Sequence, residues 1–159
     1  MITRITGWSL FLALGMTAAL SPPAAGQTKD KVYRVLTPDQ VGAILTDAKI
    51  KFTKSTPSGA PTDTDFDFKH NNYGILLTLR DGKMLWISSY FPETTLKKIN
   101  DWNIDAKFSR AVLVSQNKKT HAVVEAQLDV AGGCTENMIR RFLESFGQEV
   151  AAFDEFLKK

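Results

Sequence analysis

The most restrictive feature of this sequence is a long apolar stripe close to its C-terminal end. Between Thr135 and about Leu157, apolar side chains recur at the spacing of one helix face. The stripe is about 140° wide, and its members are Met138, Ile139, Phe142, Leu143, Phe146, Val150, Phe153, Phe156 and Leu157. A stripe this broad and rich in phenylalanine needs a large apolar partner, so this segment is predicted to be the main core helix. Gly147 is expected on the opposite side, where it weakens the helix by about 1 kcal/mol relative to alanine.

Segments of alternating residues upstream of this helix predict the sheet that it covers. Strands are expected at residues 63–68, 73–80, 84–90, 111–114 and 122–129. A further short extended piece is expected at 51–54. Because the connections are short enough for hairpins, the sheet is predicted to be antiparallel.

Two shorter helices are expected. Thr37-Pro38-Asp39-Gln40 is a helix start in which Thr37 caps and Gln40 completes a capping box. A second helix, from Pro92 to about Lys107, is expected to bury one face formed by Leu96, Ile99, Trp102 and Ala106. Asn103 is expected to donate and accept structural hydrogen bonds at a strand end or loop. The order helix, three strands, helix, two strands, helix predicts a two-layer α+β domain with an antiparallel sheet packed by helices.

The N-terminal region has the three parts of a secretory signal peptide. Arg4 is the only charge before Lys29, an apolar stretch occupies residues 7–20, and the small residues Ala24 and Gly26 precede the expected cleavage site. As a helix the apolar stretch would span about 21 Å, short of the roughly 30 Å of a bilayer core. We therefore expect a signal peptide at 1–26, a linker at 27–34 and one domain at 35–159. The mature chain is expected in the periplasm or outside the cell, without a stable membrane anchor.

Charge and cysteine content exclude several classes. The 20 Lys and Arg residues exceed the 17 Asp and Glu residues by a formal charge of +3, which is too small to point to a nucleic-acid partner. The single cysteine excludes an internal disulfide. Packing alone must therefore hold an exported domain of this length.

Five short motifs, taken in their order and spacing, resemble the YbjN domain family of bacterial sensory transduction regulators. They are Thr37-Pro38-Asp39-Gln40, Arg80-Asp81-Gly82-Lys83, Lys98-Ile99-Asn100-Asp101-Trp102-Asn103, Phe108-Ser109-Arg110-Ala111 and Asp129-Val130-Ala131-Gly132-Gly133. The resemblance covers roughly residues 35–157. It implies a fold similar to type III secretion chaperones, which are small α+β proteins that bind other proteins. It implies regulation without naming a reaction, and it brings no catalytic residues.

Residues with reactive or metal-binding chemistry are sparse. Cys134 precedes the final helix, where a helix N-terminus can activate a thiol, but no base is placed to assist it. Cys134 is interpreted as a small, partly buried residue near the cap, with a reactive thiol as the alternative. Residues 63–67 open like an EF-hand loop but lack its later Gly and Glu, and His70 and His121 have no second ligand nearby in sequence. Ala131-Gly132-Gly133 is interpreted as a chain reversal rather than an anion site. We expect no catalytic residues, no metal and no cofactor.

The hairpin at Asp81-Gly82 is the most informative candidate site. A two-residue turn would pair Leu77 with Trp86 and Leu79 with Met84, placing all four on one face. A one-residue bulge would change which residues face the helices. The opposite face would carry Leu76, Thr78, Leu85 and Ile87. Since both faces are largely apolar, one is expected to stay open as an interface, with Leu77, Met84 and Trp86 as candidates. The alternative is that the final helix and the loops cover both faces.

These observations together predict an exported, non-enzymatic module that binds a protein partner or itself. The alternative is a carrier of a small apolar ligand held between sheet and helices. A thiol-dependent redox protein using Cys134 ranks lowest. A deep apolar cavity would favour the carrier, a flat apolar sheet face the protein partner, and a thiolate beside a basic side chain the redox protein.

Overall fold

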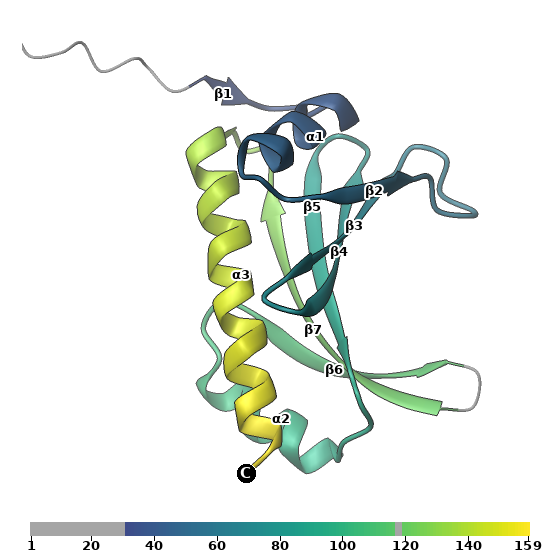
Figure 1. Cartoon of the computed structure of the whole chain (residues 1–159), viewed down its shortest axis with the longest axis vertical. Helices are drawn as coiled ribbons and strands as arrows, with labels where there is room; N and C mark the ends of the chain where they lie inside the picture. Colours follow the sequence, from purple (N-terminus) through teal and green to yellow (C-terminus); the bar gives the residue numbers. More distant parts are fainter. Residues whose placement is uncertain (1–30, 117–118) are drawn as a thin grey trace, which may run out of the picture.

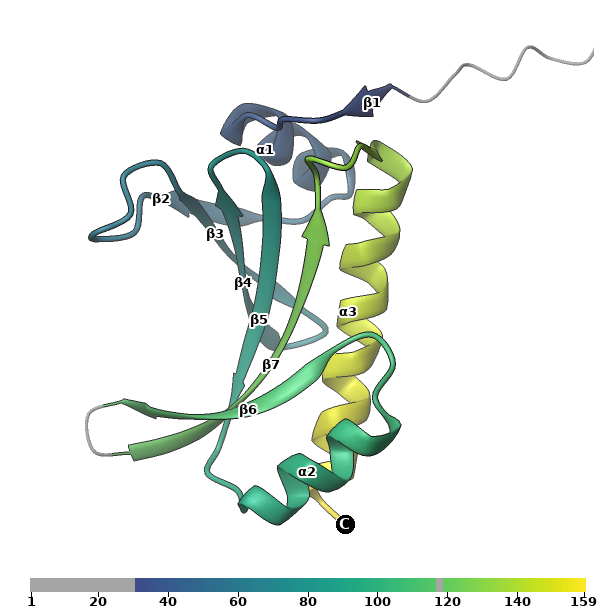
Figure 2. The same cartoon turned by 180° about the vertical axis from the view of Figure 1, so that it is seen from behind.

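Helix α3, Glu136–Leu157, runs along one face of a six-stranded antiparallel sheet (Figure 1). The structure, a computed structural model, describes residues 31–116 and 119–159. The strand order is β2-β3-β4-β5-β7-β6, and the strands are Phe52–Ser55 (β2), Thr64–His70 (β3), Tyr73–Arg80 (β4), Met84–Phe91 (β5), Arg110–Gln116 (β6) and Lys119–Asp129 (β7). Seen from behind, helix α1, Pro38–Asp47, lies at one end of the sheet and helix α2, Leu96–Asp105, at the other (Figure 2). The predicted mixed α+β class is confirmed.

Each helix begins directly after a threonine whose hydroxyl caps its first turn. Thr37 Oγ1 accepts a hydrogen bond from the Gln40 amide at 3.2 Å, and Gln40 Oε1 accepts one from the Thr37 amide at 2.8 Å. This is the predicted capping box. Helix α2 begins later than predicted, after Thr95, whose hydroxyl accepts from the Lys98 amide. Thr135 caps α3 in the same way.

The order of elements differs from the prediction in two places. The short piece expected at 51–54 is β2, a full member of the sheet, so four strands rather than three separate α1 from α2. A second, two-stranded sheet was not predicted: β1, Val32–Tyr33, pairs with β8, Cys134–Thr135. Strands of two residues carry no periodicity, so pattern reasoning has nothing to detect. β1 falls inside the segment predicted as a linker.

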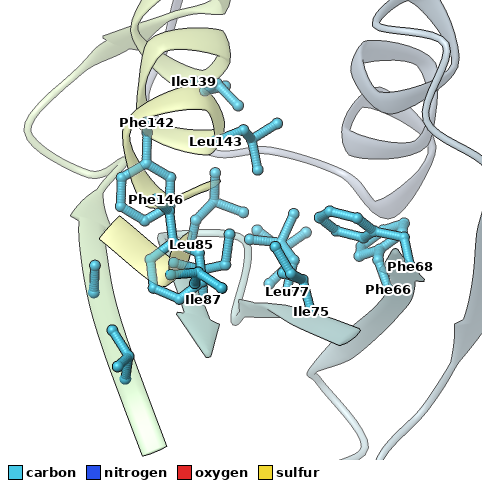
Figure 3. Close-up of a cluster of buried hydrophobic side chains, with 14 of the residues drawn as sticks. Phe66, Phe68, Ile75, Leu77, Leu85, Ile87, Ile139, Phe142, Leu143 and Phe146 are labelled. Atoms are coloured by element: carbon cyan, nitrogen blue, oxygen red, sulfur yellow. The ribbon is translucent and has the colours of Figure 1, made fainter. Parts of the chain in front are cut away.

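The core fills the space between the sheet and the helices. Ile139, Phe142, Leu143 and Phe146 of α3 point toward Leu77, Leu85 and Ile87 of the central strands (Figure 3). Val41, Ile44 and Leu45 add the buried face of α1. Near the other end, Phe153 meets Phe91 at 4.9 Å and Trp102 at 5.0 Å between ring centroids. Edge-to-face aromatic pairs of this kind add stability beyond their buried area.

Two predicted core residues are exposed instead. Met138 is 45% exposed, because it lies at the edge of the α3 stripe while Ile139 takes the inward position. Leu96 is 61% exposed, because it is the first residue of α2 and the inward positions belong to Ile99 and Trp102. The residues at the centre of each predicted apolar stripe are therefore buried as expected, whereas Met138 and Leu96 at the margins are exposed.

Gly147 is also placed differently from the prediction, since it is buried rather than on a free helix face. A Cβ atom at this position would lie 2.5 Å from Cδ2 and 2.6 Å from Nε2 of His70. His70 ends β3, at the tip of the β3–β4 hairpin. The glycine therefore lets this hairpin approach α3 closely.

Asn103 makes the structural hydrogen bonds predicted for it. Its Nδ2 donates to the carbonyl of Ala111 at 2.9 Å, and its Oδ1 accepts from the amide of Ala111 at 2.8 Å. Ala111 lies in β6, an edge strand of the sheet. The side chain thus takes the place of a neighbouring strand at that point and fixes α2 to the sheet edge.

Candidate functional site

The candidate site is the face of the sheet opposite the helices. Side chains alternate between the two faces of a strand, and in β4 and β5 the buried set contacts the helices. The other set, together with its partners across the strands, is called the open face here. Its residues are Asp65, Asp67, Leu76, Thr78, Arg80, Met84, Trp86, Ser88, Tyr90, Arg110, Val112, Val123, Glu125, Gln127 and Asp129.

The register of the central hairpin corrects the predicted grouping. The turn holds three residues, and Arg80 pairs with Met84, so Thr78 rather than Leu77 lies opposite Trp86. Asp81 and Gly82 both have positive φ, 48° and 69°. The extra turn residue shifts β5 by one position, which moves its side chains to the other face. Leu77 is therefore a core residue with 0% exposure, whereas Met84 and Trp86 lie on the open face.

Trp86 is held in place from two sides. The guanidinium of Arg80 lies over its ring, 3.5 Å from the centroid, a cation–π contact. Its Nε1 donates to Glu125 Oε2 at 3.1 Å, and Arg110 Nε donates to Glu125 Oε1 at 2.6 Å. Glu125 is 7% exposed, so these two bonds give its buried carboxylate partners.

The arrangement of this cluster suits the recognition of a binding partner. A tryptophan already fixed by neighbours loses little side-chain entropy when a partner covers it. Half-buried Leu76 and Met84 flank it, and Tyr90 is 54% exposed further along β5. The open face therefore combines a fixed aromatic anchor, apolar neighbours and charged groups, the mixture found at binding hot spots.

Cys134 is fully buried, which corrects the expected partial exposure. It is 0% exposed and pairs with Tyr33 in the small sheet. Burial raises the pKa of its thiol, and the nearby Asp129 carboxylate raises it further. Both effects disfavour the thiolate that a reactive cysteine needs.

The remaining polar candidates have structural partners. Asp129 Oδ1 accepts from the Ala131 amide at 2.8 Å, so an acidic side chain already occupies the glycine turn. Asp65 accepts from Thr78 Oγ1 at 2.6 Å across β3 and β4. Within residues 31–116 and 119–159, no three His, Cys, Asp or Glu side chains gather as metal ligands would. None of the helices described is long and apolar enough to cross a membrane.

One surface was not predicted at all. A groove with a volume of about 900 Å³ lies where β2, β3, the α1–β2 connection and α3 come together. Its lining mixes apolar side chains such as Phe52 and Leu143 with charged ones such as Lys49 and Arg140. Three separate segments build it, within residues 48–53, 67–71 and 140–144, so no single motif could indicate it. It is not the deep, wholly apolar cavity that a carrier of apolar ligands would need.

Comparison with known proteins gives a family and a fold. Residues 37–159 match the YbjN family, described as "Putative bacterial sensory transduction regulator". Among solved structures, one similar chain is that of "Crystal structure of YbjN, a putative transcription regulator from E. coli". It has 15% identity and a TM-score of 0.61, and the match covers 78% of this chain and 93% of that one. None of the curated proteins matches the sequence.

Proposed function

The chain belongs to the YbjN family, and from that premise we propose that it is an exported, non-enzymatic regulatory module that binds a protein through its open face. The observation that carries this proposal is Trp86, which lies opposite the helices, stacked under Arg80 and bonded to Glu125. Tryptophan and arginine are the residues most often found at the energetic centre of protein interfaces.

The family description supports a regulatory role, and the site supports binding. The similarity to type III secretion chaperones that the family resemblance implies belongs to the same proposal, because those proteins act by binding other proteins. Export rests on the sequence alone, with Arg4, the apolar stretch at 7–20 and the small residues before position 27. An exported regulator would meet its partner, or a second copy of itself, outside the cytoplasm.

The two other classes receive less support. A thiol-dependent protein needs an accessible thiolate, and Cys134 is fully buried. A carrier of apolar molecules needs an apolar cavity, and the groove is ringed by charged side chains. The mixed lining of the groove favours a ligand that has both an apolar part and a charge.

The partner can be identified by crosslinking from the open face itself. A photoreactive phenylalanine analogue placed at position 90, where exposed Tyr90 lies on the open face and Trp86 is left in place, should crosslink the partner, or a second copy, in cells that produce the protein. The same analogue at Gln148, an exposed position on α3, is the matched control and should yield no such product. Crosslinks from position 148 without any from position 90 would refute the proposal.

The energetic test compares binding and folding in the same variants. Trp86→Ala should weaken binding to the crosslinked partner by about 2 kcal/mol, as a hot spot does. It should cost only about 1–2 kcal/mol of stability, since the side chain is half-buried and loses one cation–π contact and one hydrogen bond. Leu77→Ala, on the other face of the same hairpin, should cost about 2–5 kcal/mol of stability and leave binding by the folded fraction unchanged. Normal binding by folded Trp86→Ala would place the interface elsewhere.

A further inference from the structure

The groove is a gap between the two layers of the fold at one edge of the sheet. β2 pairs with β3 only from Phe52 onward, opposite Phe68. Before Phe52 the chain leaves toward α1, while β3 continues to His70. Leu143 of α3 forms the facing wall. Near its hairpin end, His70 approaches Gly147 of the same helix.

The floor of the groove is apolar and continuous with the core. Phe68 and Leu143 are core residues with 4% and 7% exposure, and both belong to the cluster drawn in Figure 3. Ile50 and Phe52 are half-buried and pack against the same cluster. A ligand with an apolar body would therefore lie mainly on Ile50 and Phe52, next to the small exposed part of Phe68 and Leu143.

The rim of the groove carries an excess of positive charge. Four cationic side chains line it, Lys49, Lys51, Lys69 and Arg140, against the carboxylates of Asp67 and Glu144. Arg140 is engaged by Glu136 at 2.6 Å on its own helix. Among the residues described, no carboxylate lies within salt-bridge distance of any of the three lysines. Their charges are available to a ligand.

The backbone of Lys49 has an unusual conformation. Lys49 follows α1 with φ of 60°, the left-handed conformation that usually selects glycine or asparagine after a helix. A lysine here costs stability relative to glycine, yet it places a cation at the groove. Strained positions of this kind gather at functional sites.

We propose that this groove binds a small anionic amphiphile, a molecule with an apolar chain and one carboxylate head, such as a fatty acid. The chain would lie on Ile50, Phe52, Phe68 and Leu143, and the carboxylate would meet Lys49, Lys51 and Lys69. The volume of about 900 Å³ is within the range of small-molecule sites. Walls on both the sheet and the helix side suit a compact ligand better than an extended peptide. This site is separate from the Trp86 cluster, so it does not rest on the proposed protein-binding function.

The test uses dodecanoate, below its aggregation concentration, as the probe. Titration calorimetry should show one site per chain, with affinity at least tenfold higher than for dodecyltrimethylammonium, which has the same tail and a cationic head. Acetate, the head without the tail, should not bind measurably. Amide chemical-shift changes on adding dodecanoate should centre on residues 48–53, 67–71 and 140–144. Equal affinity for both head groups, changes centred elsewhere, or tighter binding of an acidic peptide to these residues would overturn the proposal.

Lysine variants then separate the effect of charge at the groove from any effect on folding. Replacing Lys49, Lys51 and Lys69 together by glutamine should weaken dodecanoate binding about tenfold, which corresponds to about 1.4 kcal/mol. The matched control replaces three exposed lysines outside the groove lining, at positions 83, 119 and 159, with the same change in net charge and no change in affinity.

The single variant Lys49→Gly should weaken binding while the unfolding temperature stays the same or rises, because glycine relieves the positive φ. Equal losses of affinity in the groove triple variant and its control would show a general charge effect and refute the site. An unchanged affinity for dodecanoate in both triple variants would also refute the site.

Discussion

We expect an unusual result from replacing Gly147 by alanine beside His70. Helix propensity favours this substitution, whereas packing opposes it. Replacing a helix glycine by alanine normally stabilises a protein by about 1 kcal/mol. Here the new Cβ would lie 2.5 Å from Cδ2 of His70, about 1 Å closer than ordinary contact. The imidazole must therefore move. An off-rotamer side chain costs about 0.5–1.5 kcal/mol, and overpacking costs about 1–3 kcal/mol.

We therefore expect Gly147→Ala to be neutral or to destabilise the protein by up to about 1 kcal/mol, because His70 is half-buried and can yield only in part. In the His70→Ala background the obstacle is absent, and the same substitution should stabilise by about 1 kcal/mol. The coupling energy between the two positions should then be about 1 kcal/mol or more, as is usual for residues in contact. Urea unfolding of the four proteins measures each term, provided that the slope of the free energy with denaturant stays constant.

Gly42→Ala is the matched control for this cycle. Gly42 also lies in a helix, α1, but its Cβ would meet the Cζ atom of Phe52 at 3.2 Å, a milder contact with the end of a side chain. Its effect should be the same with and without His70. If Gly147→Ala stabilises equally in both backgrounds, His70 does not limit the approach of α3, and the reasoning is refuted.

Three further predictions concern other parts of the fold. Asn103→Ala should destabilise by about 1–3 kcal/mol, because two edge backbone groups of β6 lose their hydrogen bonds, with the free energy of unfolding as the measurement. Cys134→Ser should cost about 1–3 kcal/mol, since a buried hydroxyl replaces a fully buried thiol; Cys134→Ala should cost less, and the opposite order would contradict burial as the cause. The pKa of Asp154 is lowered by hydrogen bonds from Lys158 and Tyr73, so its stabilising effect is present above about pH 4 and lost as the pH falls through its folded pKa. Asp154→Asn should flatten that acid-side loss in unfolding curves measured from pH 6 down to 2.

Much of this fold follows from local patterns. The stripe of α3, the capping box at Thr37 and the strand at 73–80 each depend on residues close in sequence. The spacing of apolar residues and the capping residues predict such elements, because the interactions that form them are mostly local. The role of Asn103 also followed from its position at the margin of an apolar helix face. These features sufficed to predict the mixed α+β class with an antiparallel sheet.

What the open face contains depended on the tertiary structure. A two-residue turn and a three-residue turn at Asp81 are nearly indistinguishable in sequence, yet the choice between them moved Trp86 to the face opposite Leu77. The two-residue strands of the small sheet, the contact between Gly147 and His70, and the groove all join segments far apart in the chain. Side-chain alternation has a period of two, so one added turn residue exchanges every position of the following strand between the core and the open face. Local pattern therefore determined the helices and the longer strands, and long-range pairing decided the short strands and which side chains are available to bind.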